Sequence, residues 1–347
     1  MFRERILSPA DDEYLSRVRA TLGELEGADA AQGAETYARH LLERGLPVLF
    51  DDTHLSFVTG VPRRTIAYMR SYPDRFYSEF RIGKRDGGSR PIRAPKPSLR
   101  AVQQWIARNV LTAYEPHPCC HGFVRGRSVV TNATPHVGKP RLFKADLSDF
   151  FGSIPRSRVF GIFRRAGYSP AVANLLADLT TLDGRLPQGA PTSPALANVA
   201  AFTLDCRLAG LARRHDISYT RYADDLTFSG VLAGSPRLRR TIFRIIHDED
   251  FRVNEHKTRL VGRNRRQLVT GVVVNDVAHW PRWRRRWLRQ EIYYLRRFGI
   301  DDHMARRGVD KSFYKEFVYG HVYALNQLHP EEARSYLEVL DAIDWPY

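Results

Sequence analysis

Two adjacent aspartates lie between two alternating runs, and this feature restricts the fold more than any other. The sequence ISYTRYADDLTFSG alternates apolar and polar residues over 217–221 and again over 226–228. A period of two predicts two β-strands, with Ala223, Asp224 and Asp225 at a tight hairpin between them. Adjacent carboxylates repel each other there unless cations are bound. The chain is therefore expected to build a sheet with concentrated negative charge at one hairpin.

A third acid ends another predicted strand. In LFKADLSDFFGSI, residues Leu142, Lys144 and Asp146 alternate with apolar neighbours, and the strand runs out at Asp146. Acidic oxygens from two separate elements can converge on two divalent ions about 3.5–4 Å apart, and magnesium prefers oxygen ligands. Taken alone, an Asp-Asp pair is more often part of a turn than of a catalytic site. The interpretation therefore needs further motifs.

Composition and charge indicate a folded protein that binds a polyanion. The chain has 347 residues, 43% hydrophobic and 11% aromatic, which suffices for two or three subdomains. The net charge of +16 favours nucleic acid as partner, although charge alone does not separate an enzyme from a binder. We expect no membrane association, because no apolar run reaches about 18 residues and the charged start is unlike a signal peptide. The predicted location is the cytoplasm.

The cysteines predict neither disulfides nor a zinc site. Cys119 and Cys120 are neighbours, so they rarely reach disulfide geometry without strain. Together with His117 and His121 they superficially resemble a metal site, but the spaced pairs of a zinc module are missing. We expect buried or idle thiols in a reducing compartment.

The remaining patterns suggest a central mixed domain between two basic flanks. Residues 16–46 read as a helix, a second helical run follows over 55–69, and FRIGKRDGGSRPIRAPKPS is a basic hairpin followed by an amphipathic helix. From Trp280 onward the chain reads as helical and rich in arginine. There we predict an apolar stripe with arginines outside it; the stripe comprises Trp283, Trp287 or Leu288, Leu295 and Phe298, and the arginines are Arg284, Arg285, Arg289 and Arg296. These arginines either form a solvated face or track phosphates.

The order KADLSDFF, LPQGAPTSPALAN, YADD, FRVNEHKTRL and QLVTGVVVN resembles the polymerase core of reverse transcriptases, from about residue 80 to 274. This resemblance implies an α+β right-hand fold with fingers, a ferredoxin-like palm and a C-terminal helical thumb. It implies an N-terminal helical region over 1–79, fingers over 80–141, a palm with interleaved fingers elements over 142–277, and a thumb over 278–347.

The resemblance also implies roles for individual residues. Asp146 and Asp224 correspond to bridging ligands of two Mg²⁺ ions, for which Mn²⁺ could substitute, with Asp225 as third carboxylate and the Leu147 carbonyl as a backbone ligand. Phe151 corresponds to the aromatic residue that excludes a 2′-hydroxyl and so selects deoxynucleotides, although a core role beside Phe150 is the alternative. Further substrate contacts are implied for Lys84, Arg90, Gln188, Gly189 and Lys257. The simpler alternatives are a basic hairpin that grips the template, for Lys84 and Arg90, and a turn before a helix, for Gln188 and Gly189. In that helix Ser193 is a plausible N-cap.

Two short elements resemble retron enzymes in particular. Asn132-Ala133-Thr134-Pro135-His136 is similar to their NAxxH element, and Val269-Thr270-Gly271 is similar to their VTG element. The resemblance implies a noncoding RNA partner that is template and primer, 2′-hydroxyl priming, a branched RNA-linked DNA product and a role in antiphage defence with a separate effector protein. It also suggests that RNA contacts involve Asn132, His136, Val269, Thr270, Gly271, Arg284, Arg285 and Arg289.

Other functions stay open at this point. A group II intron-like, CRISPR-associated or abortive-infection polymerase would share most of these blocks, and a template-dependence assay separates the last of these. An RNA-binding protein that keeps a polymerase scaffold without activity is the non-enzyme alternative. Intact Asp146, Asp224 and Asp225 argue against it.

Overall fold

The computed structural model describes residues 5–83, 87–307 and 313–345. Its chain divides into two compact units. Unit 1 consists of Met1–Val124, Leu147–Leu208 and Ile242–Asn254, and unit 2 consists of Arg125–Asp146, Ala209–Thr241 and Glu255–Tyr347. Two helices, α10 (Phe202–Arg214) and α11 (Pro236–Asp248), contribute residues to both units. Helices and antiparallel strands occur together, as the predicted α+β class requires. The predicted subdomain boundaries remain predictions.

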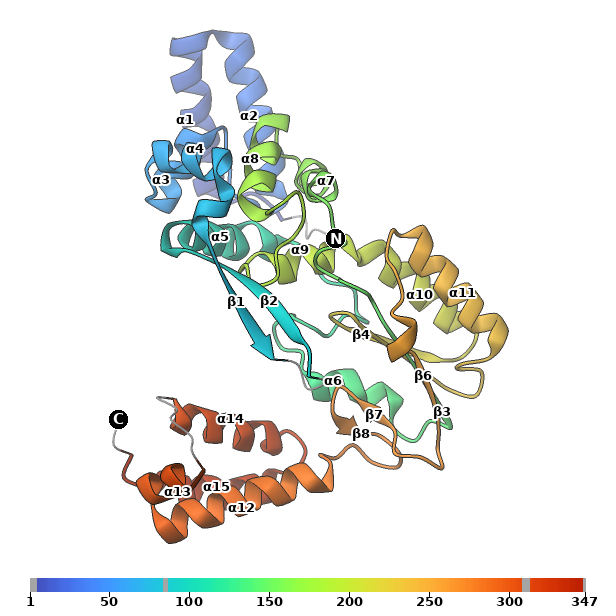
Figure 1. Ribbon diagram of the computed structural model, residues 1–347. Helices are drawn as coiled ribbons and strands as arrows, with labels where there is room; N and C mark the ends of the chain where they lie inside the picture. The colour runs from blue at the N-terminus through green and yellow to red at the C-terminus, as the bar shows by residue number, and fades with distance from the viewer. Residues whose placement is uncertain (1–4, 84–86, 308–312, 346–347) are drawn as a thin grey trace. The chain divides into compact units, whose positions relative to one another are not determined.

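Unit 1 begins with two antiparallel helices, α1 (Pro9–Glu26) and α2 (Ala28–Glu43), which lie side by side in Figure 1. The range 16–46, predicted as helical, is helical over most of its length, but Gly27 divides it into two helices. Gly27 has a φ of 94°, a conformation that glycine adopts without steric cost, and it turns the chain between the helices.

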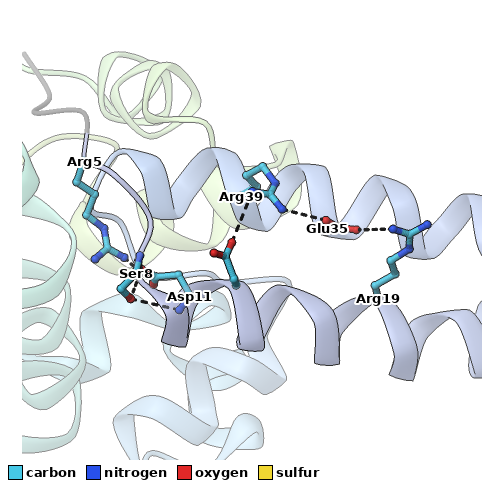
Figure 2. Close-up of polar contacts among 7 residues, drawn as sticks. Arg5, Ser8, Asp11, Arg19, Glu35 and Arg39 are labelled. Atoms are coloured by element: carbon cyan, nitrogen blue, oxygen red, sulfur yellow. Dashed lines mark hydrogen bonds and ion pairs between the residues drawn. The ribbon is translucent and has the colours of Figure 1, made fainter.

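Polar contacts hold the start of α1 and join the middle parts of the two helices, as Figure 2 shows. Ser8 and Asp11 form a capping box at the start of α1, and hydrogen bonds from the backbone and side chain of Ser8 lower the pKa of Asp11. The Glu35 carboxylate of α2 lies 3.1 Å from an Arg39 nitrogen on the same helix and 3.6 Å from an Arg19 nitrogen of α1, across the hairpin. These exposed pairs contribute little each, so packing of the two helices dominates.

The rest of unit 1 is a helical assembly that carries a two-stranded ribbon. Strands β1 (Tyr77–Gly83) and β2 (Ser89–Pro95) pair antiparallel, which confirms the predicted basic hairpin. The following α5 (Pro97–Asn109) is the predicted amphipathic helix, and it buries Val102 and Ile106. The other elements are α3 (Asp52–Thr59), α4 (Arg63–Ser71), η1 (Pro73–Phe76), η2 (Leu111–Ala113), α7 (Arg156–Ala166), α8 (Pro170–Thr180) and α9 (Ser193–Ala200).

Unit 2 contains a four-stranded antiparallel sheet in the order β4-β5-β3-β6. Its strands are β3 (Arg141–Asp146), β4 (Ser218–Tyr222), β5 (Asp225–Ser229) and β6 (Arg259–Gly262), and η4 (Glu255–Lys257) precedes β6. The strands predicted on either side of Asp224 and before Asp146 are therefore confirmed. The short helix α6 (Val129–Ala133) and η3 (Thr134–His136) contact β4 within this unit.

The C-terminal helices of unit 2 share one apolar core with the small hairpin of β7 (Leu268–Val269) and β8 (Val272–Val273). These helices are α12 (Arg282–Phe298), α13 (Ile300–Arg307), α14 (Tyr314–Asn326) and α15 (Pro330–Asp341). The predicted apolar stripe of α12 was wrong in part. Leu288 and Leu295 are buried, but Trp283 is 58% exposed and Phe298 is 40% exposed. Glu291 and Ile292 take the buried positions instead.

The predicted burial of the cysteines is confirmed for Cys119 and Cys120. Within the described ranges, no single helix is long and apolar enough to span a membrane, and only α9 with α10, bent by 50°, would pass as a pair by length and composition.

Candidate functional site

Strand pairing in unit 2 brings the three predicted metal-binding aspartates to one end of the sheet. Asp146 ends β3 and pairs directly with Asp225, the first residue of β5. On its other side Asp225 pairs with Tyr222, which leaves Ala223 and Asp224 as a two-residue turn. Opposed positions on paired strands place their Cβ atoms about 4.5–5.5 Å apart. The backbone thus gathers carboxylates that are far apart in the sequence.

Asp224 carries the electrostatic consequence of this arrangement. Burial raises its pKa, and the charges of Asp146 and Asp225 raise it further, whereas Lys257 acts in the opposite direction. The preceding Ala223 has a φ of 57°. A residue other than glycine pays about 1–2 kcal/mol for this left-handed conformation. Charge repulsion and backbone strain therefore coincide at the turn.

Two lysines provide positive charge beside the aspartates. The Nζ of Lys257 lies 3.1 and 3.3 Å from the two carboxylate oxygens of Asp146. The Nζ of Lys144 lies 3.3 Å from Oδ1 of Asp225. The sequence predicted a site role for Lys257 and missed Lys144. The signal was present, because a strand period of two places Lys144 on the face of Asp146.

The donor set suits a hard divalent cation. Three carboxylates supply the oxygen ligands that Mg²⁺ prefers. Burial and then the charges of Asp146 and Asp225 raise the pKa of Asp224, and a bound cation would offset both effects. In the part of the chain that the structure describes, no three His, Cys, Asp or Glu side chains converge on one ion position. Asp146 and Asp225 are each held by a lysine instead. The residues therefore fit a cation by charge and chemistry, with the lysine contacts exchanged for metal contacts.

The predicted nucleotide contacts that follow Asp146 lie in unit 1. The side chain of Leu147 is buried, and its backbone forms a bridge with Val253. Phe150 is buried against Phe251, whereas Phe151 is only half-buried, with its ring 6.1 Å from that of Phe123. Of the two neighbouring phenylalanines, Phe151 is thus the one with a surface left for a ligand.

The Gln188-Gly189 segment is fixed against strand β2. The backbone N–H of Arg93 donates to the Gln188 carbonyl at 2.8 Å. Gly189 has a φ of 121°, and a Cβ there would lie 2.8 Å from the Arg93 carbonyl oxygen. Glycine is therefore required by conformation and by close approach. The prediction of Ser193 as N-cap was wrong by one residue, because Thr192 is the N-cap and the Ser193 hydroxyl donates to the Pro187 carbonyl.

The cations of the β1–β2 ribbon, among them the predicted Arg90, differ in their surroundings. Arg90 is exposed on β2, opposite Ile82. Arg93 forms ion pairs with Glu79 and Asp183, so its charge is largely neutralised. Lys84 lies outside the described residues.

The NAxxH and VTG elements form one internal network. His136 is fully buried, with Nδ1 2.6 Å from the Ser229 hydroxyl and Nε2 2.8 Å from the Thr220 hydroxyl. The Asn132 side chain is fully buried and donates to the Thr270 hydroxyl at 3.3 Å.

This burial is at odds with the predicted RNA contacts of Asn132, His136 and Val269, since none of the three has exposed surface. Their contacts attach α6 and the β7–β8 hairpin to the sheet. Thr270 and Gly271 form the two-residue turn of that hairpin, and both have positive φ, as a type I′ turn requires. Gly271 remains exposed at the tip.

The three arginines of α12 that were predicted to bind RNA have partners within the chain. Arg285 and Arg289 form ion pairs with Glu332, at 2.6 and 3.3 Å. Arg284 lies over the Trp280 ring, 4.1 Å from its centroid. The Arg289 side chain is nevertheless 67% exposed, and the exposed face of α12 also carries residues that sequence reasoning missed, because a helix period does not say which stripe meets the core. These residues are Arg282, Arg286, Tyr293 and Arg297.

Comparisons with known proteins identify the family of this chain. The family model for reverse transcriptase (RNA-dependent DNA polymerase) matches residues 82–279. The chain is 37% identical to the retron Mx65 reverse transcriptase of Myxococcus xanthus, over 84% of this chain and 72% of that protein. It is 42% identical to the retron Mx162 reverse transcriptase of the same organism, over 57% of this chain and 47% of that protein. Among solved structures, telomerase from Candida albicans is similar with a TM-score of 0.45 and 10% identity, over 77% of this chain and 55% of that one. The chain therefore belongs to the retron reverse transcriptases and is an RNA-directed DNA polymerase.

Proposed function

We propose that this polymerase copies a structured noncoding RNA that is both template and primer. Synthesis would start from a 2′-hydroxyl of that RNA and yield branched, RNA-linked DNA. One observation supports the proposal most: Asp146 and Asp225 are paired strand residues, and Asp224 lies in the turn that joins Tyr222 to Asp225. Nucleotidyl transfer needs such a cluster of carboxylates on a rigid sheet.

Four groups would hold the ions of a two-metal site. Asp146 and Asp224 would be the main ligands of two Mg²⁺ ions, with Asp225 as the third carboxylate and the Leu147 carbonyl as a backbone ligand. When bound, the ions activate the attacking hydroxyl and stabilise the leaving pyrophosphate. Lys257, released from Asp146, is then placed to donate a proton to pyrophosphate. Mn²⁺ should substitute for Mg²⁺, because it also accepts oxygen ligands.

Residues of unit 1 would select and orient the deoxynucleotide. The half-buried ring of Phe151 would pack under the sugar and exclude a 2′-hydroxyl. Gln188 and Gly189 would approach the nucleotide through a loop that β2 holds in place. Arg90 and Lys84 would neutralise the triphosphate, whose charge develops as pyrophosphate leaves.

The exposed stripe of α12 is a better candidate for RNA contact than Arg284 and Arg285, which are only partly exposed, and the predicted Arg289 is exposed as well. Arg282, Arg286 and Arg297 lie on one face with Tyr293, which is 58% exposed. Cationic side chains beside an exposed ring suit phosphates and unpaired bases of RNA. Gly271 and Thr270, at the β7–β8 turn, remain available for backbone contact.

The test is synthesis by the purified chain with the RNA encoded beside its gene, deoxynucleotides and Mg²⁺. The expected product is DNA whose 5′ end stays joined to RNA and is released by a debranching enzyme. Asp224→Asn should abolish incorporation, a loss of several kcal/mol in transition-state stabilisation, with RNA affinity nearly unchanged. Asp276→Asn, which removes an exposed carboxylate of the same unit, is the control. Extension of any primer without template would refute the proposal, and so would an active Asp224→Asn.

We further propose that the product acts in antiphage defence with a separate effector protein, within the cytoplasm. Cells that carry the intact locus should resist phage, and Asp224→Asn should remove the protection. Protection that survives this substitution would refute the defence role of DNA synthesis.

A further inference from the structure

We infer that Arg221 is a positioning residue that clamps the Ala223-Asp224 turn in the conformation the catalytic carboxylates need. Arg221 is the largest fully buried side chain among the described residues, and it lies on β4 directly before Tyr222. Its Nη1 donates to the carbonyl oxygen of Ala223 at 3.1 Å. The role of the carboxylates belongs to the proposed function, and the clamp is an addition to it.

A buried guanidinium needs a physical reason. Removing a charge from water is costly unless its donors are satisfied by fixed acceptors. Here one acceptor is a backbone carbonyl only two residues along the chain. The guanidinium is a rigid, planar donor, and its hydrogen bond to Ala223 closes a short ring that includes the backbone of Tyr222. This ring restrains the backbone between Arg221 and Ala223. Burial of the guanidinium costs free energy, and its hydrogen bond to the Ala223 carbonyl restrains the turn to one conformation.

The turn needs such a restraint. Ala223 has a φ of 57°, and alanine populates this region about tenfold less readily than glycine. Asp224 follows directly, so rotation at Ala223 would redirect its carboxylate away from Asp146. Repulsion among the three carboxylates also favours opening of the turn before cations bind. Arg221 opposes both tendencies through the Ala223 carbonyl.

The experiment combines two substitutions in the full chain. Arg221→Met keeps a long side chain but removes every donor, and kcat should fall about 100-fold because the carboxylates are misplaced. Mn²⁺ binding, measured by electron paramagnetic resonance without RNA or nucleotide, should weaken about tenfold, while the KM for deoxynucleotides and RNA affinity change less than about twofold.

Addition of Ala223→Gly to Arg221→Met should recover about tenfold in kcat and most of the Mn²⁺ affinity, because glycine enters the left-handed region without the steric penalty. Arg239→Met is the matched control. Arg239 is a partly buried arginine of the same unit that lies over the Phe143 ring, and its loss should leave kcat and Mn²⁺ affinity unchanged.

The inference is overturned if Ala223→Gly restores neither quantity, or if Arg221→Met leaves Mn²⁺ affinity intact. Should Arg221→Met fail to fold, the same comparison is made with Arg221→Lys, which keeps the charge and loses the planar fork. Because Mn²⁺ binding is measured without RNA, the clamp is tested even if the chain makes no branched DNA.

Discussion

Replacement of His136 by alanine should destabilise unit 2, and the size of the effect follows from its contacts. The imidazole is fully buried and bonds the hydroxyls of Ser229 and Thr220 at 2.6 and 2.8 Å. Each lost hydrogen bond costs about 1 kcal/mol net, and a buried hydroxyl left without a partner costs about 1–3 kcal/mol. Thr220 also donates to the Asn132 carbonyl, so Ser229 bears most of the second penalty. With the cavity that remains, we expect a loss of about 3–5 kcal/mol.

Urea unfolding followed by tryptophan fluorescence measures this loss. Trp280 and Trp287 pack in the core of unit 2 and report on its unfolding. His247→Ala removes an exposed histidine of α11 and should change the free energy of unfolding by less than about 0.5 kcal/mol. RNA affinity, measured where both variants are folded, should stay within about twofold of the parent chain. A folded His136→Ala of near-parental stability that has lost RNA affinity would show that the histidine contacts RNA directly, against the network described here.

Three further outcomes are expected. Gly189→Ala should lower the free energy of unfolding by about 2 kcal/mol or more and reduce deoxynucleotide incorporation, because the added Cβ would lie 2.8 Å from the Arg93 carbonyl oxygen. Gly184 also has a positive φ, but no atom lies within 4 Å of the Cβ that Gly184→Ala would add. Thermal unfolding of the two variants therefore separates the clash from the conformational penalty. Arg286→Ala should weaken RNA binding and reduce the slope of log affinity against log salt concentration by about 1. Arg285→Ala should instead lower the free energy of unfolding, because it removes the ion pair with Glu332. Equal slopes for the two variants in salt titrations would contradict this assignment. Asp224→Asn should raise the urea midpoint of unfolding at neutral pH, because a carboxyl whose pKa is raised on folding stabilises the fold only while protonated and loses that contribution as pH rises through the folded pKa. The gain in midpoint should shrink on acidification toward the ordinary pKa of 3.8. A gain that is constant with pH would argue against burial and repulsion as the cause of the raised pKa.

The sequence by itself determined the strands and the positions of the acids. The alternation before Asp146 and on both sides of Asp224 is a property of neighbouring residues, and a period of two allows few structures other than a paired strand. The basic ribbon and the helix after it followed from the same local rules. The order of these blocks also identified the polymerase family, although no single block would have done so.

Only the tertiary structure decided which side chains face which partner. Asn132 and Thr270 are far apart in the sequence, so neither motif by itself predicts the hydrogen bond between them. Glu332, on α15, determines that Arg285 faces inward and Arg286 outward, and the composition of α12 fits both orientations. The clamp by Arg221 depends on the complete burial of this side chain, and the presence of a charged residue within a strand does not predict such burial. Periodicity fixes the conformation of a segment because it depends on neighbours along the chain, whereas the partner of each side chain depends on packing between segments that the chain brings together only when it folds.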